Sequence, residues 1–485
     1  MRRLLALIGL LLVGGLSVQA ALAGGPLDTG LAATADFYGP DADLAYARTR
    51  QAGATFVRLY TDWNVIAPVN PSAGGSDPRD PDNPNYHWDR LDEALDRARA
   101  NGLTPIVDIV TAPRWAWGTT TATEPGGGSI KPSVAALASF ATAAAERYSG
   151  GTAGRPRVKY WQLWNEPNLS LYLRPQFKGN QLVSAAWYRQ MTNAFYKSVH
   201  GVKADNVVIA GGQSPFGGYS EQSVSSSPLR FMRDLLCMSA GPNPRPTCTK
   251  KIQFDIWSHH PYTSGGPTHQ AQNPDDVSIG DLPEMKRLLD AAVRAGHVVS
   301  RQHVRFWITE FSWDSQPGDP KGVPPALHTR WVSEALYRMW QSGVSLVTWF
   351  NLRDDPFDVT RENFCQCGLW LRGTGGLATD KPKRSLEAFR FPFVAFNQTN
   401  GSVSFWGRTP DSKAGQLVIE QRVGAGWARL ASVRSGARGI FAGSVKARSK
   451  SAPVRATLVS TSETSVPFSL IRPPDLPICA FGSCG

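Results

Sequence analysis

Eight short apolar runs, rich in β-branched and aromatic residues, recur along residues 31–350 and alternate with amphipathic helical stretches. Alternation of this kind is typical of parallel strands joined by helical crossovers. Eight such units, with no glycine-rich phosphate-binding loop in the sequence, predict a (β/α)8 TIM barrel rather than an open doubly wound sheet. The expected strands are 31–37, 55–62, 104–110, 158–165, 206–212, 253–259, 304–310 and 344–350. The expected helices are 88–101, 133–148, 181–203, 228–239, 282–298 and 327–342.

A second pattern begins near residue 393, where short alternating strands follow one another without helices between them. This pattern predicts a small C-terminal β-sandwich domain. It carries few aromatic residues, so support of the barrel is a better interpretation of its role than glycan binding. The predicted domains are therefore a barrel over 24–392, a β-sandwich over 393–472, and a tail with proline and cysteine over 473–485.

The N-terminus has the pattern of a secretory signal peptide over residues 1–23. Two arginines precede a mostly apolar run over 4–16, and Ala21-Leu22-Ala23 forms a small-x-small cleavage site. A membrane anchor is the alternative, but the run is short for a span and is interrupted by glycines. No later stretch is long and apolar enough to cross a bilayer. We therefore expect a secreted, extracellular protein that does not associate with a membrane after the leader is removed.

The six cysteines fall into three local couples, and an oxidising compartment favours disulfides between them. Cys365 and Cys367 are separated by one residue, and so short a loop strains disulfide geometry, so this couple could equally remain as free thiols. A zinc site would require cysteine and histidine spacings that this sequence lacks. The other couples are Cys237 with Cys248 and Cys479 with Cys484.

Lysine and arginine outnumber aspartate and glutamate by 51 to 39, which gives a formal net charge of +12. Such a charge weakly favours anionic surfaces or acidic polymers. The basic residues form no block and the chain carries no recognisable nucleic-acid module, so we expect no nucleic-acid partner.

Two glutamates close predicted strands of the barrel. Glu166 ends the fourth strand, in Trp-Asn-Glu-Pro-Asn, and Glu310 ends the seventh, in Trp-Ile-Thr-Glu-Phe. The C-terminal ends of these strands face each other across the barrel mouth, where barrel enzymes build their active sites. Two carboxylates there can act as general acid and nucleophile at a sugar acetal, and a spacing of about 5–5.5 Å goes with retention of configuration. A single glutamate is more often a surface salt-bridge partner, but two at strand ends disfavour that interpretation.

The run Asn165-Glu166-Pro167 resembles the signature of the clan A retaining (β/α)8 glycoside hydrolases, and the chain is similar to their families 39 and 5, the latter cellulase-like. The resemblance covers roughly residues 31–391. It implies that Glu166 is the general acid/base and that Glu310 is the nucleophile. One departure lies at the end of strand three, where family 5 enzymes usually carry a histidine and this chain has valine, threonine and alanine at 110–112.

The same resemblance implies residues that bind substrate or orient the nucleophile. Arg58 would hydrogen-bond near the nucleophile, Tyr262 would orient it, and Trp349 would form the floor of the sugar subsite. Asn165 would donate to the sugar 2-hydroxyl, a bond that strengthens in the transition state. Each has a structural alternative, since an arginine can pair with a rim acid and a tryptophan can belong to the core. The full set is Arg58, Asn165, His260, Tyr262 and Trp349.

Tryptophans follow several strand ends, and exposed indole rings there would stack on the apolar faces of pyranose rings. The candidates of this kind are Trp63, Trp115, Trp117 and Trp313, of which Trp115 and Trp117 lie in the long loop after the third strand, although several of the 16 tryptophans must belong to the core.

Together these features predict a secreted retaining β-glycosidase that acts on an extracellular oligosaccharide or polysaccharide. The predicted partner is the carbohydrate substrate, with no cofactor and no metal. A non-catalytic carbohydrate-binding barrel or cell-surface adhesin is the main alternative, but it would be expected to lose one of the two glutamates. A metal-dependent hydrolase would need histidine and aspartate clusters at strand ends, and only His259 with His260 approaches that pattern. The sequence defines neither the sugar and linkage nor the oligomeric state.

Overall fold

The computed structural model describes residues 25–118, 127–151, 154–218, 225–356 and 365–478. The predicted signal peptide and the Cys479–Cys484 couple lie outside these ranges.

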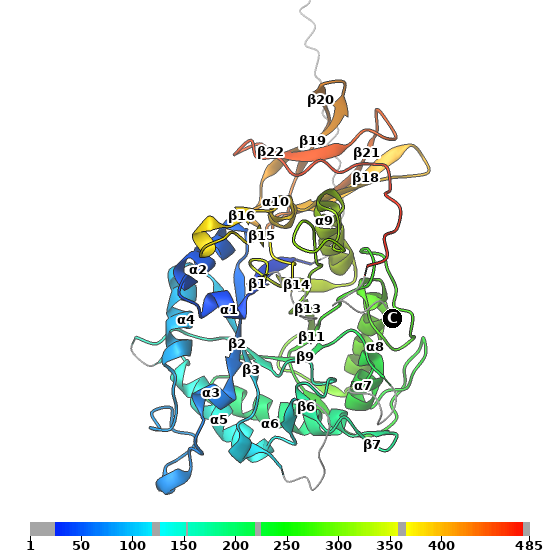
Figure 1. Ribbon diagram of the computed structural model, residues 1–485. Helices are drawn as coiled ribbons and strands as arrows, with labels where there is room; N and C mark the ends of the chain where they lie inside the picture. The colour runs from blue at the N-terminus through cyan, green and yellow to red at the C-terminus, as the bar shows by residue number, and fades with distance from the viewer. Residues whose placement is uncertain (1–24, 119–126, 152–153, 219–224, 357–364, 479–485) are drawn as a thin grey trace, which may run out of the picture.

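Eight parallel strands close into a barrel, with helices around its outside (Figure 1), which confirms the predicted fold class. In ring order the strands are β1 (Asp28–Ala32), β2 (Phe56–Asp62), β3 (Thr104–Val110), β5 (Tyr160–Leu163), β9 (Val207–Gln213), β11 (Ile256–His259), β13 (Arg305–Ile308) and β14 (Val344–Trp349). Seven of the eight overlap their predicted ranges closely. The first differs, because β1 ends at Ala32 and residues Thr34–Phe37 form the short helix α1.

The long helices place their apolar residues against the barrel. In α4, Leu91, Ala94, Leu95 and Ala98 recur at spacings of three and four residues and are all buried. The longer helices are α2 (Ala42–Gln51), α4 (Asp89–Ala100), α5 (Val134–Arg147), α6 (Ser184–Val202), α7 (Pro228–Leu236), α8 (Leu282–Arg294) and α9 (Pro325–Gln341).

The barrel interior changes from apolar to polar toward the C-terminal ends of the strands. The apolar layer is a buried cluster of Phe56, Ile106, Val207, Ile209, Ile256, Trp307 and Leu346. Strand side chains alternate between the two faces, so residues two positions further along point the same way. Asp108 stands two residues after Ile106, and Ser258 two residues after Ile256, and both are buried. The barrel therefore has a polar floor facing its C-terminal mouth.

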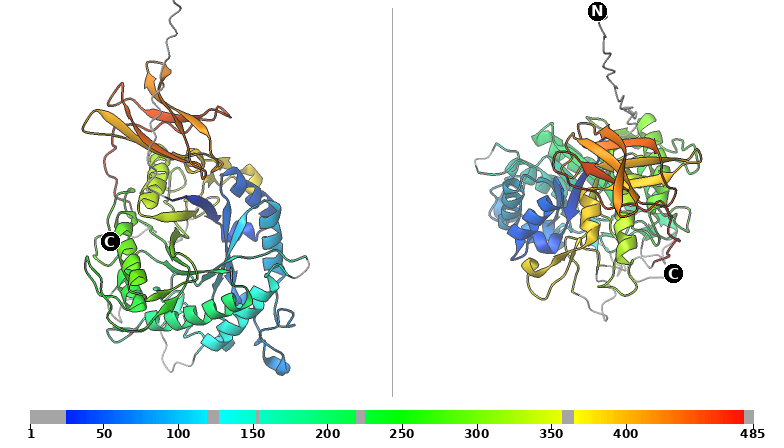
Figure 2. Two further views of the ribbon diagram at one scale, coloured as in Figure 1. Left: turned by 180° about the vertical axis from the view of Figure 1, so that it is seen from behind. Right: turned by 90° about the horizontal axis from the view of Figure 1, so that it is seen from above.

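The C-terminal region consists of two antiparallel three-stranded sheets that lie beside α9 and α10 (Arg384–Arg390), as Figures 1 and 2 show. Trp406 packs against Tyr337 and Trp340 of α9, with ring centroids 5.5 and 5.4 Å apart. This small β domain is therefore joined to the barrel through an aromatic contact. One sheet holds β17 (Phe393–Asn397), β18 (Ser402–Arg408) and β21 (Ile440–Lys446), and the other holds β20 (Gly426–Arg434), β19 (Gln416–Val423) and β22 (Val454–Leu458).

Two of the expected cysteine couples are disulfides in the structure. Cys237 bonds to Cys248 with a Cα–Cα distance of 5.2 Å, and Cys365 bonds to Cys367 with a distance of 5.1 Å. Within the ranges given above, no helix has the length and apolar character needed to cross a bilayer.

Candidate active site

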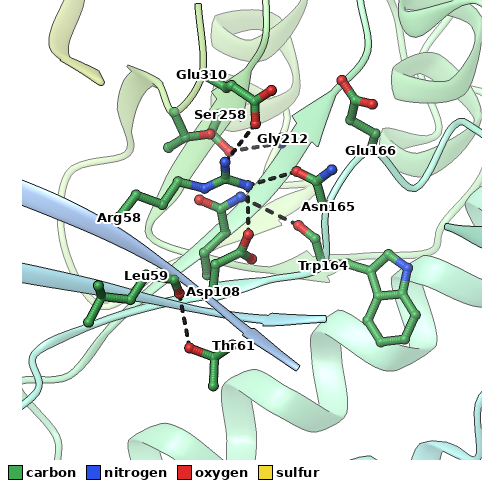
Figure 3. Close-up of polar contacts among 12 residues, drawn as sticks. Arg58, Leu59, Thr61, Asp108, Trp164, Asn165, Glu166, Gly212, Ser258 and Glu310 are labelled. Atoms are coloured by element: carbon green, nitrogen blue, oxygen red, sulfur yellow. Dashed lines mark hydrogen bonds and ion pairs between the residues drawn. The ribbon is translucent and has the colours of Figure 1, made fainter. Parts of the chain in front are cut away.

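The two strand-end glutamates meet at the C-terminal mouth of the barrel. Glu166 follows β5 and Glu310 follows β13, which are separated by two strands in the ring. Figure 3 shows their carboxyl groups on opposite sides of one space. Both side chains are mostly covered, with exposed fractions of 13% for Glu166 and 16% for Glu310. They are therefore reachable by a ligand while being largely shielded from bulk water.

The backbone around Glu166 adopts a conformation that ordinary residues avoid. Trp164 has a φ of 70° and Glu166 a φ of 39°, both in the left-handed region. Such strain costs on the order of 1–3 kcal/mol per residue and persists only where surrounding contacts impose it. Trp164 N–H donates to Ile109 at 2.8 Å, and Glu166 N–H donates to Gly212 at 2.9 Å. These neighbouring strands hold the turn that aims the Glu166 side chain at the barrel mouth.

Arg58, on β2, joins both sides of the site through one buried guanidinium. It donates to Glu310 Oε2 at 2.8 Å, to Asp108 Oδ2 at 2.6 Å and to Asn165 Oδ1 at 2.7 Å (Figure 3). Because Asn165 accepts through its oxygen, its amide nitrogen is left to donate elsewhere. The structure thus brings Arg58 and Asn165 together with Glu310, as the sequence suggested.

Asp108 is a member of this network that the sequence analysis missed. Burial raises the pKa of Asp108 to about 7, because the loss of hydration outweighs the stabilising charge of Arg58, and the nearby charge of Glu310 adds to the rise. For Arg58 itself, burial lowers the pKa, but the carboxylates of Asp108 and Glu310 outweigh burial and raise it above its usual range. Arg58 therefore stays charged at any physiological pH.

His260 lies between the two glutamates. Its Nδ1 is 3.1 Å from Glu166 Oε1 and 3.9 Å from Glu310 Oε2, and its Nε2 is 3.2 Å from Thr309 Oγ1. Burial holds the pKa of His260 well below its usual value, and the charge of Arg58 lowers it further. A neutral imidazole therefore contacts Glu166, and it adds no positive charge to the site.

Glu166 and Glu310 have different surroundings. Burial raises the pKa of Glu166 well above its usual value, and the negative charge of Glu310 raises it further. Glu310 accepts hydrogen bonds from Arg58 and, at 2.6 Å, from the Tyr262 hydroxyl. One carboxyl is thus kept protonated while the other has the partners of an ionised group. Unequal environments of this kind separate the roles of acid and nucleophile.

A cavity of about 370 Å³ opens onto Arg58, Asn165 and Glu310. Its remaining wall comes from strand ends, the short helix α1 and loops after the strands, and includes several residues that the sequence did not single out. The lining residues outside the predicted set are Ala32, Thr34, Ala35, Tyr60, Tyr172, Phe350, Asn351 and Asp355. A larger cavity, of about 730 Å³, lies at the N-terminal end of the strands, away from both glutamates. The C-terminal cavity is therefore the candidate active site.

The family model "Cellulase (glycosyl hydrolase family 5)" matches residues 26–351, which is more than half of the chain. The chain belongs to glycosyl hydrolase family 5. Its fold is similar to a family 39 glycoside hydrolase from the gut symbiont Bacteroides cellulosilyticus WH2, at 16% identity and a TM-score of 0.50, over 87% of this chain and 79% of that one. A family 39 enzyme from Xanthomonas axonopodis pv. citri matches at 14% identity and a TM-score of 0.49, over 88% and 94%. No curated protein matches the chain.

The tryptophans expected to bind sugar pack against other parts of the protein in this family 5 barrel. Trp349 is 1% exposed, packs on Phe311 and Phe389, and donates from its indole to Cys367 O at 2.8 Å. Trp115 and Trp117 are partly buried, and each donates its indole N–H to a backbone carbonyl. Trp63 and Trp313 are buried as well. None of these five tryptophans belongs to the described lining of the 370 Å³ cavity. The exposure of a loop ring depends on loop packing, which the sequence pattern does not encode.

One group of side chains in the described part of the chain has the composition of a metal site. Ligand atoms of Asp314, Cys365 and Cys367 lie within 4.8 Å of one another. Both sulfurs are bonded to each other as a disulfide, so neither offers the thiolate that a metal would require. These residues therefore do not fit a metal.

Proposed function

We propose that this family 5 chain is a secreted retaining β-glycosidase that acts by double displacement on an extracellular oligosaccharide or polysaccharide. Glu310 attacks the anomeric carbon, and Glu166 protonates the departing glycosidic oxygen. Glu166 then removes a proton from the water that releases the sugar from Glu310. The observation that carries the proposal is the contrast between the environments of the two carboxyls.

The contacts of Glu310 support its role as nucleophile. Hydrogen bonds from Arg58 and Tyr262, at 2.8 and 2.6 Å, engage one carboxylate oxygen each. Charge-assisted bonds of this kind stabilise the ionised carboxylate and fix its rotamer. An ionised, oriented oxygen is what attack on an acetal carbon requires.

The contacts of Glu166 support its role as acid and then base. Its raised pKa keeps a proton available near neutral pH, and the charge of Glu310 is one cause of that rise. When Glu310 forms its bond to the sugar, that charge disappears and the pKa of Glu166 falls, so the same group can take a proton from water.

The contacts of His260 set an upper limit on the spacing of the two carboxyls. Since His260 Nδ1 is 3.1 Å from an oxygen of Glu166 and 3.9 Å from an oxygen of Glu310, these oxygens lie at most about 7 Å apart, the sum of the two distances. This bound is compatible with the roughly 5–5.5 Å of retaining enzymes.

Labelling with a 2-deoxy-2-fluoro aryl glycoside tests the proposal. The electron-withdrawing fluorine slows both steps, but the activated aryl leaving group keeps formation of the glycosyl-enzyme faster than its hydrolysis. The glycosyl-enzyme therefore accumulates, and peptide mass mapping locates the sugar. We expect it on Glu310, and we expect Glu310→Ala to lose at least about 10³-fold in turnover. Glu284→Gln, an exposed glutamate on α8, is the matched control and should keep wild-type turnover. Labelling of another residue, or an active Glu310→Ala protein, would overturn the assignment.

A further inference from the structure

We propose that Asp355 is a sugar-binding residue of the site and that it makes the site selective for neutral sugars over uronic acids. This inference rests on the function proposed above and adds the class of sugar accepted next to Glu310.

Asp355 is held on the wall of the 370 Å³ cavity by backbone contacts with the segment of the Cys365–Cys367 disulfide. Asp355 N–H donates to Cys365 O at 2.9 Å, and Cys365 N–H donates back to Asp355 Oδ2 at 3.0 Å. The Gln366 side chain donates to Asp355 O at 2.9 Å. Three hydrogen bonds thus fix both the backbone and the carboxylate of this half-buried residue.

The second carboxylate oxygen, Oδ1, is free to bind a ligand. Across the described residues it has no hydrogen-bond partner, while Oδ2 is engaged by Cys365. Asp355 lines the same cavity as Glu310 and Asn165. An ionised carboxylate only accepts hydrogen bonds, so its natural partner in a sugar is a hydroxyl group. A hydroxyl of the sugar bound next to Glu310 supplies that donor.

The charges around the cavity disfavour an acidic sugar. Among the described residues that line it, Arg58 is the one cation, and Asp108, Glu310 and Asn165 already occupy its guanidinium. Glu310 and Asp355 both contribute carboxylates to the lining. Among these described lining residues, a uronate carboxylate would therefore meet like charges and find no free cation to pair with.

Two basic side chains close to this segment, Arg353 and Lys383, form ion pairs of their own. Arg353 donates to Asp380 at 2.7 Å, and Lys383 donates to Asp354 at 2.5 Å. Neither is available to neutralise Asp355 or a bound uronate.

The test compares 4-nitrophenyl β-glycosides in matched pairs that differ only at C6: glucoside with glucuronide and galactoside with galacturonide, together with the mannoside and xyloside. We expect the preferred neutral member of a pair to exceed its uronide by at least about 100-fold in kcat/KM. In Asp355→Asn, which keeps the size but removes the charge, activity on the neutral glycoside should fall roughly 10–100-fold. The neutral-to-uronide ratio should also narrow at least tenfold. Asp319→Asn, a rim carboxylate outside the cavity lining, should leave both values unchanged.

A purely structural role for Asp355 predicts a different result. Loss of the Cys365 contact alone would lower the melting temperature and reduce both activities equally, without changing the ratio. An unchanged ratio in Asp355→Asn, or a wild-type protein that hydrolyses a uronide as well as its neutral partner, would overturn the inference. Asp355→Glu, which retains the charge, should keep the selectivity and separates charge from folding effects.

Binding measurements test the selectivity for neutral sugars independently of the proposed hydrolysis. If the protein hydrolyses no glycoside of this panel, the proposed function is contradicted for substrates that carry a single sugar unit. Calorimetric titration with the iminosugar isofagomine and its 6-carboxylate analogue then decides the selectivity. We expect the uncarboxylated compound to bind at least about 100-fold more tightly, and equal affinities, or no binding of either, would overturn the selectivity.

Discussion

Arg58 donates a shorter hydrogen bond to Asp108, at 2.6 Å, than to the proposed nucleophile Glu310, at 2.8 Å. The two bonds come from different nitrogens of one guanidinium, and the nitrogen that faces Asp108 also donates to Asn165. Asp108 is fully buried and is not among the lining residues of the 370 Å³ cavity, and its side chain hydrogen-bonds to Arg58. It therefore acts as a positioning residue that fixes Arg58, and through Arg58 the orientation of Asn165.

Substitution of Asp108 by asparagine should reduce kcat/KM by roughly 10–100-fold, because it removes a charge-assisted bond worth about 1.5–3 kcal/mol. A specific readout is the preference for a glycoside over its 2-deoxy analogue. Loss of Arg58 alignment frees the Asn165 amide to turn away from the sugar 2-hydroxyl, so this preference should shrink. Asp290→Asn, an acid on the surface of α8, is the control. A lower activity with an unchanged preference would contradict the positioning role.

The positions of the two glutamates could be predicted because the local sequence around each one defines the end of a strand. Each ends an apolar strand, and the barrel topology alone brings the ends of strands four and seven together. Asp108 carried a usable signal as well, since a carboxylate within Thr-Pro-Ile-Val-Asp-Ile-Val is out of place in an apolar strand. Its meaning depends on Arg58, which lies 50 residues away in the sequence.

The loop residues could not be placed in this way. Asp355 lines the cavity because backbone contacts with Cys365 hold it there, and such contacts follow from loop packing rather than from a periodic pattern. Trp349 was expected at the sugar site because it is an aromatic residue at a strand end, yet it is only 1% exposed. The residues at strand ends follow from the hydrophobic periodicity and the barrel topology, whereas the residues that line the walls of the site depend on how the loops pack.

Arg408 should be essential for the attachment of the β domain to the barrel. It is fully buried and donates from β18 to Thr29 Oγ1 of β1 at 3.0 Å and to Phe389 O of α10 at 3.4 Å. Substitution by alanine removes the side-chain packing and leaves buried acceptors without partners, which should cost about 2–5 kcal/mol. Differential scanning calorimetry should show the lower melting temperature, while Arg434→Ala, an exposed position on β20, should change stability by about 0.5 kcal/mol or less.

The same contacts predict the fate of a shortened chain. A protein ending near residue 391 loses Trp406 from the aromatic contact with Tyr337 and Trp340, and it also loses Arg408. We expect it to be insoluble or much less stable, because an apolar face of α9 becomes exposed. A soluble and fully active shortened chain would show that the β domain does not support the barrel.

Removal of Glu166 should affect substrates according to their leaving groups. Only a poor leaving group needs a proton to depart, so Glu166→Ala should slow natural glycans far more than activated aryl glycosides. Azide should restore turnover of the activated substrates, because the vacated space admits a nucleophile that needs no general base, and the product should be a β-glycosyl azide of retained configuration. Equal losses on both substrate types, with no azide product, would remove Glu166 from the acid/base role.

The pH dependence of kcat/KM should show the protonation state of Glu166 directly. Because burial and the charge of Glu310 raise the pKa of Glu166 well above its usual value, the free enzyme holds this proton at neutral pH and loses it as the pH rises. Activity on a substrate with a poor leaving group should therefore fall on the alkaline side as the pH passes through that raised pKa. In Glu166→Ala, measured on an activated aryl glycoside, this alkaline decline should disappear, because the group that loses the proton is absent. An alkaline decline that survives in Glu166→Ala would assign it to another group, and Asp108, whose pKa burial raises to about 7, would be the first to test by the same measurement in Asp108→Asn.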